Sequence, residues 1–406
     1  MNSKRAAYLA VLVAALGYFV DIYDLILFSV VRVKSLVSIG VPADHLLDAG
    51  VTLLNLQMFG MLLGGILWGV LGDRRGRLSV LFGSILLYSI ANIANAFATT
   101  VPMYGALRFV AGIGLAGELG AGVTLVSELL SRETRGYGTT IVASVGILGA
   151  LAAVAVSETF DWRAAYIVGG VLGLALLVMR VSVRESGMFQ AAKSTTAPRG
   201  NFLALFSDRS RVTRYLAVIM VAVPAWYVIG ILATFSPEFA KAMGLPFQPT
   251  GGRSILWLYS GLVLGGLGSG LLSQVLRSRK KALGVFLVLT VGGCVAYFLQ
   301  VATTLTGFYA LCVAMGFGIG YWAVFITVAA EQFGTNLRAT ATTTAPNFVR
   351  GAVVPMTWAF QWFRDGAGLG VVGGGIAVGV IVVFLAVISL AGLTETFGKD
   401  LDYIES

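Results

Sequence analysis

The sequence has few charged residues, and this shortage excludes most classes of soluble protein. Of its 406 residues only 12% are Asp, Glu, Lys or Arg, whereas a soluble globular domain carries about 25%, because its surface must stay hydrated. Apolar residues make up 57% of the chain, and the mean hydropathy is +0.88. Most of the outer surface must therefore face something other than water.

Cysteine, histidine and nucleotide-binding motifs are also scarce or missing. The only cysteines are Cys294 and Cys312, each inside an apolar run, and the only histidine is His45, so we expect neither a disulfide framework nor a metal site. No Gly-x4-Gly-Lys-Ser/Thr loop is present, which argues against ATP as the energy source. We expect no cofactor and no enzymatic activity, because a single histidine provides no catalytic cluster.

What the chain has instead is a series of long apolar runs with short polar connections. A run of about 20 apolar residues crosses the hydrocarbon core of a bilayer as a helix. We therefore predict an all-α membrane protein with twelve transmembrane helices. They lie near residues 6–30, 50–71, 79–98, 103–128, 138–157, 163–182, 213–236, 253–275, 282–303, 307–330, 340–361 and 369–393.

Lysine and arginine gather on one side of this predicted topology. With both termini inside, 20 of the 28 Lys and Arg residues fall on the cytoplasmic side and 6 on the outer side, as the positive-inside rule requires. This bias accounts for the net charge of +9, so we expect no nucleic-acid partner. We predict a multi-pass protein of a prokaryotic-type inner membrane with both termini in the cytoplasm.

The two halves of the chain repeat each other, which indicates duplicated six-helix units. A polar stretch separates the first six predicted spans from the last six. We predict an N-terminal half over residues 1–182, a cytoplasmic linker over 183–212 and a C-terminal half over 213–406. The repeated positions, each shifted by 201 residues, are Gly60, Gly64, Gly65 and Gly69 with Gly261, Gly265, Gly266 and Gly270.

The loop between the second and third spans carries a family motif. Its sequence Gly-Val-Leu-Gly-Asp-Arg-Arg-Gly-Arg at 69–77 resembles the Gly-x-x-x-Asp-Arg-x-Gly-Arg signature of the major facilitator superfamily. The resemblance implies two pseudo-symmetric six-helix halves, transport by alternating access, and a conformational latch on the cytoplasmic face. A tight turn that only anchors positive charge inside is the alternative. The predicted latch residues are Gly69, Asp73, Arg74, Gly76, Arg77, Glu128, Arg135, Glu331 and Arg338.

Span four carries a second motif, Arg108-x3-Gly112-x-Gly114, which continues to Glu118. The segment 112–117 also fits Gly-x-Gly-x-x-Gly, but a dinucleotide site needs a preceding strand in a βαβ unit, so we reject that interpretation. The motif resembles the fourth helix of proton-coupled facilitators, above all metabolite–proton symporters and sugar porters. The Asp-Ile-Tyr-Asp run at 21–24 is similar to that of aromatic-acid and phosphate symporters and to the single first-helix Asp of sugar porters. The resemblance implies proton-coupled transport.

Five ionisable residues fall inside predicted spans: Asp21, Asp24, Arg108, Glu118 and Arg350. Each costs roughly 2.5–3.5 kcal/mol on insertion scales and so needs a partner or a function. Asp21 and Asp24 are three residues apart and share a helix face, and Asp24 lies at a depth similar to that of Arg108. We predict that the first four of these residues couple transport to protons. A static Asp24–Arg108 ion pair is the alternative, and Glu118 could equally hydrogen-bond a neighbouring helix.

The substrate contacts are predicted at cationic, polar and aromatic positions of the spans. Arg350 is the only strong cation inside the second half and suits a carboxylate or phosphate through its bidentate fork; a bond to Glu331 or to a helix carbonyl is the alternative. Packing alone is the alternative role for the aromatic residues. The predicted substrate-binding residues are Arg108, Glu118, Arg350, Trp226, Tyr227, Tyr321, Trp322, Asn55 and Gln57.

These features predict a secondary active transporter that carries a small organic anion, a carboxylate, together with protons. We expect it to work as a monomer, with the substrate, protons and the lipid bilayer as its partners. The alternatives are a transporter of a sugar or of a cationic or zwitterionic metabolite, or proton-driven efflux. A receptor or purely structural membrane protein is disfavoured, because the sequence shows no soluble domain.

Overall fold

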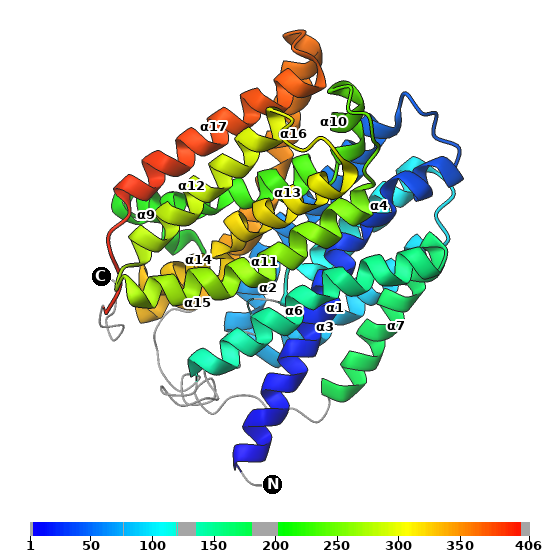
Figure 1. Cartoon of the computed structure of the whole chain (residues 1–406). Helices are drawn as coiled ribbons and strands as arrows, with labels where there is room; N and C mark the ends of the chain where they lie inside the picture. The colour runs from blue at the N-terminus through cyan, green and yellow to red at the C-terminus, as the bar shows by residue number, and fades with distance from the viewer. Residues whose placement is uncertain (1–2, 76, 119, 121–134, 181–201, 399–406) are drawn as a thin grey trace.

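The computed structural model describes residues 3–75, 77–118, 120, 135–180 and 202–398, and all regular secondary structure in these ranges is helical. Figure 1 shows the helices arranged side by side in one bundle. The helices before residue 181 are α1 (Ser3–Ser38), α2 (Leu46–Arg75), α3 (Arg77–Asn95), α4 (Val101–Leu115), α6 (Arg135–Thr159) and α7 (Trp162–Arg180).

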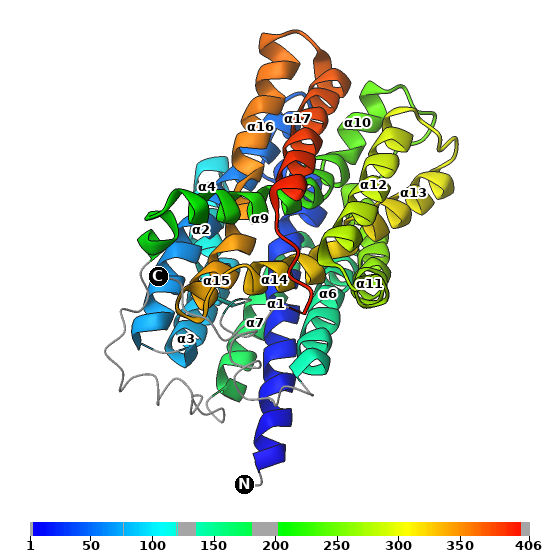
Figure 2. The same cartoon turned by 90° about the vertical axis from the view of Figure 1, so that its left-hand side faces the viewer.

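The helices after residue 201 include several short ones that continue or interrupt longer helices. They are η1 (Phe202–Phe206), α9 (Arg209–Tyr227), η2 (Val228–Ala233), α10 (Ser236–Ala242), α11 (Gly251–Val275), α12 (Arg279–Phe298), α13 (Leu305–Gly318), η3 (Ile319–Tyr321), α14 (Trp322–Glu331), α15 (Thr335–Gly351), α16 (Val353–Gln361), η4 (Trp362–Gly366) and α17 (Gly370–Gly392). Figure 2 shows α10 and the α16–α17 hairpin at the end of the molecule opposite the N-terminus.

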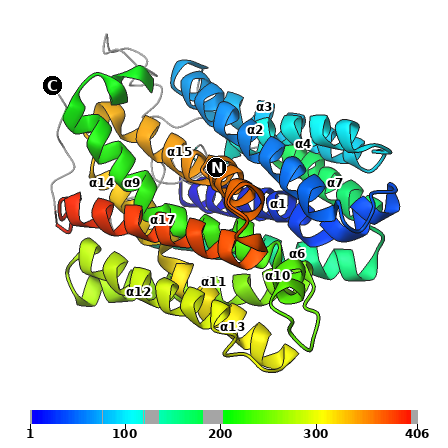
Figure 3. The ribbon, with the colours of Figure 1, turned by 90° about the horizontal axis from the view of Figure 1, so that it is seen from above.

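The helices before residue 181, called here the early helices, pack mainly on one another. The helices after residue 201, the late helices, do the same. α1 packs along α6 and α7, α2 packs on α4, and α3 packs on α4 and α7. In the later part, α11 packs on α13, α12 on α13, and α9 on α15 and α17. Two contact zones join the groups: α15 and α16 pack against α2, and α11 packs against α1 and α6. Figure 3 shows the same arrangement from above. The linker at 183–212 stays a prediction, because most of it lies outside the described residues.

Eight helices in the described part of the chain are long and apolar enough to cross a membrane, and three shorter apolar helices accompany them. Many aliphatic side chains on these helices are exposed, for example Val275 at 80% and Val288 at 71%, as expected of helices that face lipid. The all-α membrane fold is therefore confirmed. The count of twelve spans stays a prediction, because the fourth predicted span extends past Leu115 into undescribed residues and the eleventh is divided between α15 and α16.

The repeated glycines bring equivalent helices into backbone contact in both parts of the chain. A Cβ atom on Gly60 of α2 would overlap the carbonyl oxygen of Phe109 on α4, and one on Gly261 of α11 would overlap that of Val313 on α13. Small residues at such positions let two helix backbones approach closely. The 201-residue repeat thus corresponds to the same close helix pair formed twice.

Two late helices are irregular near the middle of the bundle. α9 contains Pro224, which cannot donate a backbone hydrogen bond, and it continues into the π-helix η2. α13 passes through the 3-10 turn η3 before α14 begins at Trp322. Trp226 lies between Pro224 and η2, and Trp322 directly follows η3.

Candidate functional site

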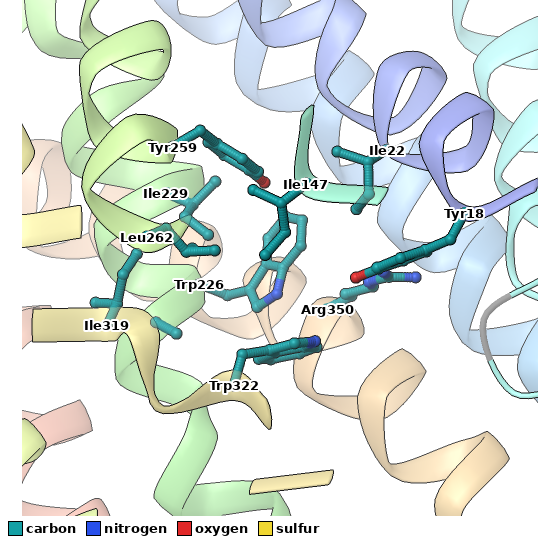
Figure 4. Close-up of a pocket in the computed structure, with 11 residues that line it drawn as sticks. Tyr18, Ile22, Ile147, Trp226, Ile229, Tyr259, Leu262, Ile319, Trp322 and Arg350 are labelled. Carbon is teal, nitrogen blue, oxygen red and sulfur yellow. The ribbon is translucent and has the colours of Figure 1, made fainter. Parts of the chain in front are cut away.

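A small internal cavity lies where early and late helices meet. Its volume is about 30 Å³, which is room for one or a few waters. Figure 4 shows aromatic rings on several of its sides. The lining residues are Tyr18, Ile22, Ile147, Ala225, Trp226, Ile229, Tyr259, Leu262, Ile319, Trp322 and Arg350.

Arg350 supplies the positive charge in the cavity wall. Its guanidinium lies 6.0 Å from the ring centroid of Trp226, and Figure 4 shows the Tyr18 hydroxyl beside it. The side chain is 1% exposed, and its Nε and Nη1 atoms have no hydrogen-bond partner in the part of the chain that the structure describes. The fork of Arg350 therefore has donors available for a ligand in the cavity.

Asp21 faces Arg350 from α1. Oδ2 of Asp21 lies 3.9 Å from Nη2 of Arg350, and both side chains are buried. Neither carboxylate oxygen of Asp21 accepts a hydrogen bond within the described ranges. The two groups form a loose ion pair between an early and a late helix, and Glu331, the alternative partner for Arg350, bonds Arg279 of α12 at 3.1 Å instead.

Asp24 occupies a separate, buried position among the early helices. Its carboxyl packs against Gly169 of α7, where a Cβ would overlap Oδ1, and its oxygens accept no hydrogen bond from described residues. Arg108 of α4 lies close by, but its Nη2 donates to the backbone oxygen of Asp24 at 3.5 Å and its Nη1 to Asn92 at 3.4 Å. The predicted proximity of Asp24 and Arg108 is observed, whereas a direct bond between their charged groups is not.

Asp21 and Asp24 thus have different surroundings although they are three residues apart. Three residues advance an α-helix by about 300°, which leaves the two side chains about 60° apart. That angle is enough to turn Asp21 toward α15 and Asp24 toward α4 and α7. Their roles in proton coupling stay predictions. Glu118, predicted with them, is buried and lies three residues beyond the end of α4.

The remaining predicted substrate residues divide into two groups. Trp226 and Trp322 line the cavity. Tyr227 and Tyr321 are not among the described residues that line it. The Tyr227 hydroxyl donates instead to the backbone oxygen of Gly375 at 2.7 Å, and the Tyr321 hydroxyl to that of Val221 at 3.0 Å. Two polar residues of α2 form helix contacts. Asn55 accepts a hydrogen bond from Thr357 of α16 at 2.6 Å, and Gln57 donates to Leu25 of α1 at 3.1 Å.

Most predicted latch residues fall outside the described part of the structure. Gly76 and Glu128 are not described, and neither are the side chains of Asp73, Arg74, Arg77, Arg135 and Arg338. Gly69 lies on α2 opposite Thr344 of α15, 3.6 Å from where its Cβ would be. Glu331 pairs with Arg279 and also accepts a hydrogen bond from Thr396 at 2.6 Å. The latch stays a prediction.

Sequence reasoning missed Tyr18 and Tyr259 as cavity residues. Tyr18 precedes Asp21 by three positions, so the helical period could have placed the two on one side of α1. Tyr259 gave no such signal, because its position in the wall depends on how α11 packs against α1 and α6. Within the described ranges no group of three or more His, Cys, Asp or Glu side chains is placed to hold a metal ion.

Comparison with known proteins identifies the fold and the relatives of the chain. The model of the Major Facilitator Superfamily matches residues 7–352. A putative niacin/nicotinamide transporter of Bacillus subtilis is 28% identical over 83% of this chain and 84% of its own length. The gentisate transporter of Corynebacterium glutamicum is 28% identical over 84% and 77%. The 3-(3-hydroxy-phenyl)propionate transporter of Escherichia coli is 29% identical over 82% of each chain.

Among solved structures, a proton:xylose symporter, XylE, superposes with a TM-score of 0.73 over 98% of both chains at 18% identity. At this identity the likeness concerns the fold alone. It covers nearly the whole chain, including both groups of helices.

Proposed function

The chain belongs to the major facilitator superfamily, and from that membership we propose that it is a proton-coupled symporter of a carboxylate with an aromatic ring. As a member of this family it is a multi-pass membrane transporter and not an enzyme. We also propose that it lies in an inner membrane with both termini in the cytoplasm and that it functions as a monomer.

The observation that carries the proposal is the composition of the cavity wall. Arg350 offers unpaired guanidinium donors, and a guanidinium fork matches a carboxylate with two parallel hydrogen bonds. The same cavity is lined by four aromatic residues, Trp226, Trp322, Tyr18 and Tyr259. Aromatic side chains hold an aromatic ring by stacked or edge-to-face contacts. Gentisate and 3-(3-hydroxyphenyl)propionate, named for two relatives, both combine a ring with a carboxylate.

The cavity must widen when a substrate enters. At about 30 Å³ it is far smaller than the roughly 300–1,000 Å³ of ordinary ligand pockets. Early and late helices contribute to its wall together, so a rocking motion of one group against the other would open it. Such alternating access around a central site is the general behaviour of transporters with repeated halves.

Uptake by purified protein in liposomes tests the substrate class and the coupling. We expect benzoate-type carboxylates to accumulate and the matched neutral amides, sugars and amines to remain outside. An inward proton gradient should raise carboxylate uptake about tenfold, and a protonophore should abolish that increase. Uptake restricted to sugars or amines would reject the substrate class, and carboxylate uptake that ignores the gradient would reject the coupling.

The role of Arg350 is tested by Arg350→Lys, which keeps the charge and removes the fork. We expect the Kd for the carboxylate to rise by about 10- to 100-fold, since a charged hydrogen bond contributes about 1.5–3 kcal/mol. Arg163→Lys is the matched control. Arg163 donates to the backbone oxygens of Ala96 and Ala98, away from the cavity. Equal binding losses in both variants would contradict a direct contact.

A further inference from the structure

The turn between α11 and α12 contains an arginine in a backbone conformation that side chains rarely adopt. Arg277 has a φ of 47°, in the left-handed region, where the Cβ of an L-residue crowds the next carbonyl oxygen. The N–H of Arg277 donates to the carbonyl oxygen of Gln274 at 3.2 Å, and the next N–H donates to that of Ser273 at 3.3 Å. This pair of bonds is the Schellman motif, whose left-handed position is usually glycine because glycine has no Cβ.

Other helix ends of the chain show which residue this motif takes when only the backbone matters. α1 and α10 end in the same pair of hydrogen bonds with glycine at the left-handed position, Gly40 with a φ of 86° and Gly244 with a φ of 67°. By the repeat of 201 residues, Arg277 corresponds to Gly76 of the early loop motif. Arginine therefore replaces the residue that fits this backbone best. Strain of this kind points to a need for the side chain itself.

The side chain of Arg277 is exposed and forms no hydrogen bond or ion pair within the described ranges. The same is true of Lys281 in the first turn of α12. The described acids that bond to this hairpin have other partners. Glu331 pairs with the side chain of Arg279 at 3.1 Å, and Glu395 accepts the backbone N–H of Arg279 at 2.9 Å. Two positive charges at this end of the hairpin are therefore available to a partner outside the described protein.

Exposed aliphatic side chains lead from these two cations along both helices. On α12, Val285 and Val288 follow Lys281 at intervals of four and three residues, which places all three on one helix face. Figure 3 shows α12 at the edge of the bundle. Exposed apolar faces of membrane helices lie against lipid chains. The corresponding exposed stripe of α11 consists of Leu264, Leu267, Leu271 and Val275.

The repeat shows two further exchanges in this turn. Val275 corresponds to Arg74 of the early loop, and Gln274 corresponds to Asp73. The late turn thus lacks the acid of the loop motif and has an exposed aliphatic residue close to its arginine. This combination suits a segment at the membrane interface, where apolar side chains enter the lipid and cations stay at the level of the head groups.

We propose that the turn between α11 and α12 binds an anionic phospholipid. Arg277 and Lys281 contact the phosphate, and the acyl chains lie along the two aliphatic stripes. A guanidinium pairs with phosphate oxygens through two parallel hydrogen bonds, and a lysine adds a point charge. The partner is a lipid and not a free anion, because the cations continue directly into surface that lipid chains cover. The site lies apart from the cavity and does not depend on the substrate proposed for it.

Local quenching of a fluorophore tests which lipid occupies the turn. Bimane is attached to Val275→Cys in a background where the buried Cys294 and Cys312 are replaced by serine, and the full chain is placed in nanodiscs. Brominated phosphatidylglycerol or brominated phosphatidylcholine is included at the same small fraction. We expect phosphatidylglycerol to quench about threefold more strongly or better, because basic residues at the membrane surface concentrate anionic lipid. Equal quenching by the two lipids would overturn the proposal.

Variants at the two left-handed positions that are not glycine separate the charge from the backbone. Arg277→Gly removes both the charge and the strain, Arg277→Gln removes the charge alone, and Arg277→Lys keeps the charge. The first two should bring the quenching ratio of the two lipids close to one, and the third should retain most of it. Gln300→Gly is the matched control, because Gln300 has a φ of 55° in the same motif at the other end of α12. A wild-type ratio in Arg277→Gln, or a lost ratio in Gln300→Gly, would contradict the site.

Thermal unfolding shows whether a lost lipid preference reflects a damaged fold. In phosphatidylcholine, Arg277→Gly should unfold at or above the wild-type temperature, because glycine adopts the left-handed backbone without strain. Phosphatidylglycerol should raise the unfolding temperature of the wild type by mass action and should have less effect on Arg277→Gly.

Inorganic phosphate, added at constant ionic strength, distinguishes a lipid from a free anion. We expect it to change neither the unfolding temperature in phosphatidylcholine nor the quenching ratio. Phosphate that stabilises the wild type but not Arg277→Gly, and that abolishes the preference for phosphatidylglycerol, would show a free-anion site and overturn the assignment to a lipid.

Discussion

At the scale of single residues, Asp24 depends on a glycine of a neighbouring helix. A methyl group on Gly169 would overlap Oδ1 of Asp24 and approach the Tyr23 ring to 2.9 Å. We expect Gly169→Ala to displace the carboxyl from its place near Arg108. Because misplacement of a functional group by about 1 Å can cost up to about a hundredfold in rate, proton-driven accumulation should fall about tenfold or more. Liposome uptake with and without a pH gradient measures this.

Gly170→Ala provides the control for that prediction. Its methyl group would lie 2.5 Å from the side chain of Ile93 and 2.7 Å from the carbonyl oxygen of Ser89, so it is similarly crowded but does not meet the carboxylate. Both variants should lose about 1–3 kcal/mol of stability by overpacking. Only Gly169→Ala should lower the ratio of gradient-driven uptake to gradient-free exchange, and equal ratios would show that Gly169 matters for packing alone.

At the scale of helices, the repeated glycines differ in importance. A Cβ on Gly265 of α11 would overlap the backbone of Phe317 on α13, whereas one on Gly270 meets nothing within 4 Å. Gly265→Ala should therefore lower the free energy of unfolding by about 1–3 kcal/mol, and Gly270→Ala should raise it by up to about 1 kcal/mol, because alanine is the better helix former. Thermal unfolding in detergent distinguishes the two signs, and a change of the same sign in both variants would contradict this account.

The N-terminus of α12 is capped by a carboxylate that follows α17. Glu395 accepts hydrogen bonds from the Ser278 hydroxyl and from the backbone N–H groups of Arg279 at 2.9 Å and Phe397 at 3.0 Å. Partial burial raises the pKa of Glu395, but the hydrogen bonds outweigh it and lower the pKa from 4.5 to about 2. Since the folded-state pKa is the lower one, the stabilisation is complete above about pH 4.5 and is lost as the pH falls toward 2.

Glu395→Gln tests this cap. The variant should be less stable than the wild type by about 1 kcal/mol at pH 7, a modest value because the site is exposed and screened. Acidification from pH 4.5 toward 2 should remove the difference, because the wild-type carboxyl is then protonated. Unfolding temperatures of both proteins at pH 7 and pH 2 measure it; a difference that persists unchanged at pH 2 would contradict the role of the charge.

At the scale of the whole molecule, the predicted orientation is open to a direct test. The loop after α12 contains the exposed Val301 and the loop before it contains Leu276; the positive-inside rule places the first outside and the second inside. In a background where the buried Cys294 and Cys312 are replaced by serine, an impermeant maleimide added to spheroplasts should label Val301→Cys at least tenfold faster than Leu276→Cys. The reverse order would invert the predicted topology.

The sequence alone determined the membrane fold and the family. Insertion into a bilayer depends on local hydropathy, so long apolar runs predict spans without knowledge of their neighbours. The loop motif at 69–77 and the repeat of glycines at a fixed interval are likewise visible in the chain itself. Buried charges could also be identified as unusual, because their cost in hydrocarbon does not depend on the partner they find.

The partner of each buried charged residue, in contrast, depends on the tertiary structure. Asp21 faces Arg350. Asp24 faces Gly169 and lies near Arg108, which donates a hydrogen bond to the backbone oxygen of Asp24. The two acids have different neighbours because their side chains are about 60° apart around α1. The same holds for the aromatic pairs, of which Trp226 and Trp322 line the cavity while Tyr227 and Tyr321 bond to backbone oxygens elsewhere. These choices depend on how helices distant in sequence pack together, and a linear pattern carries no information on that packing.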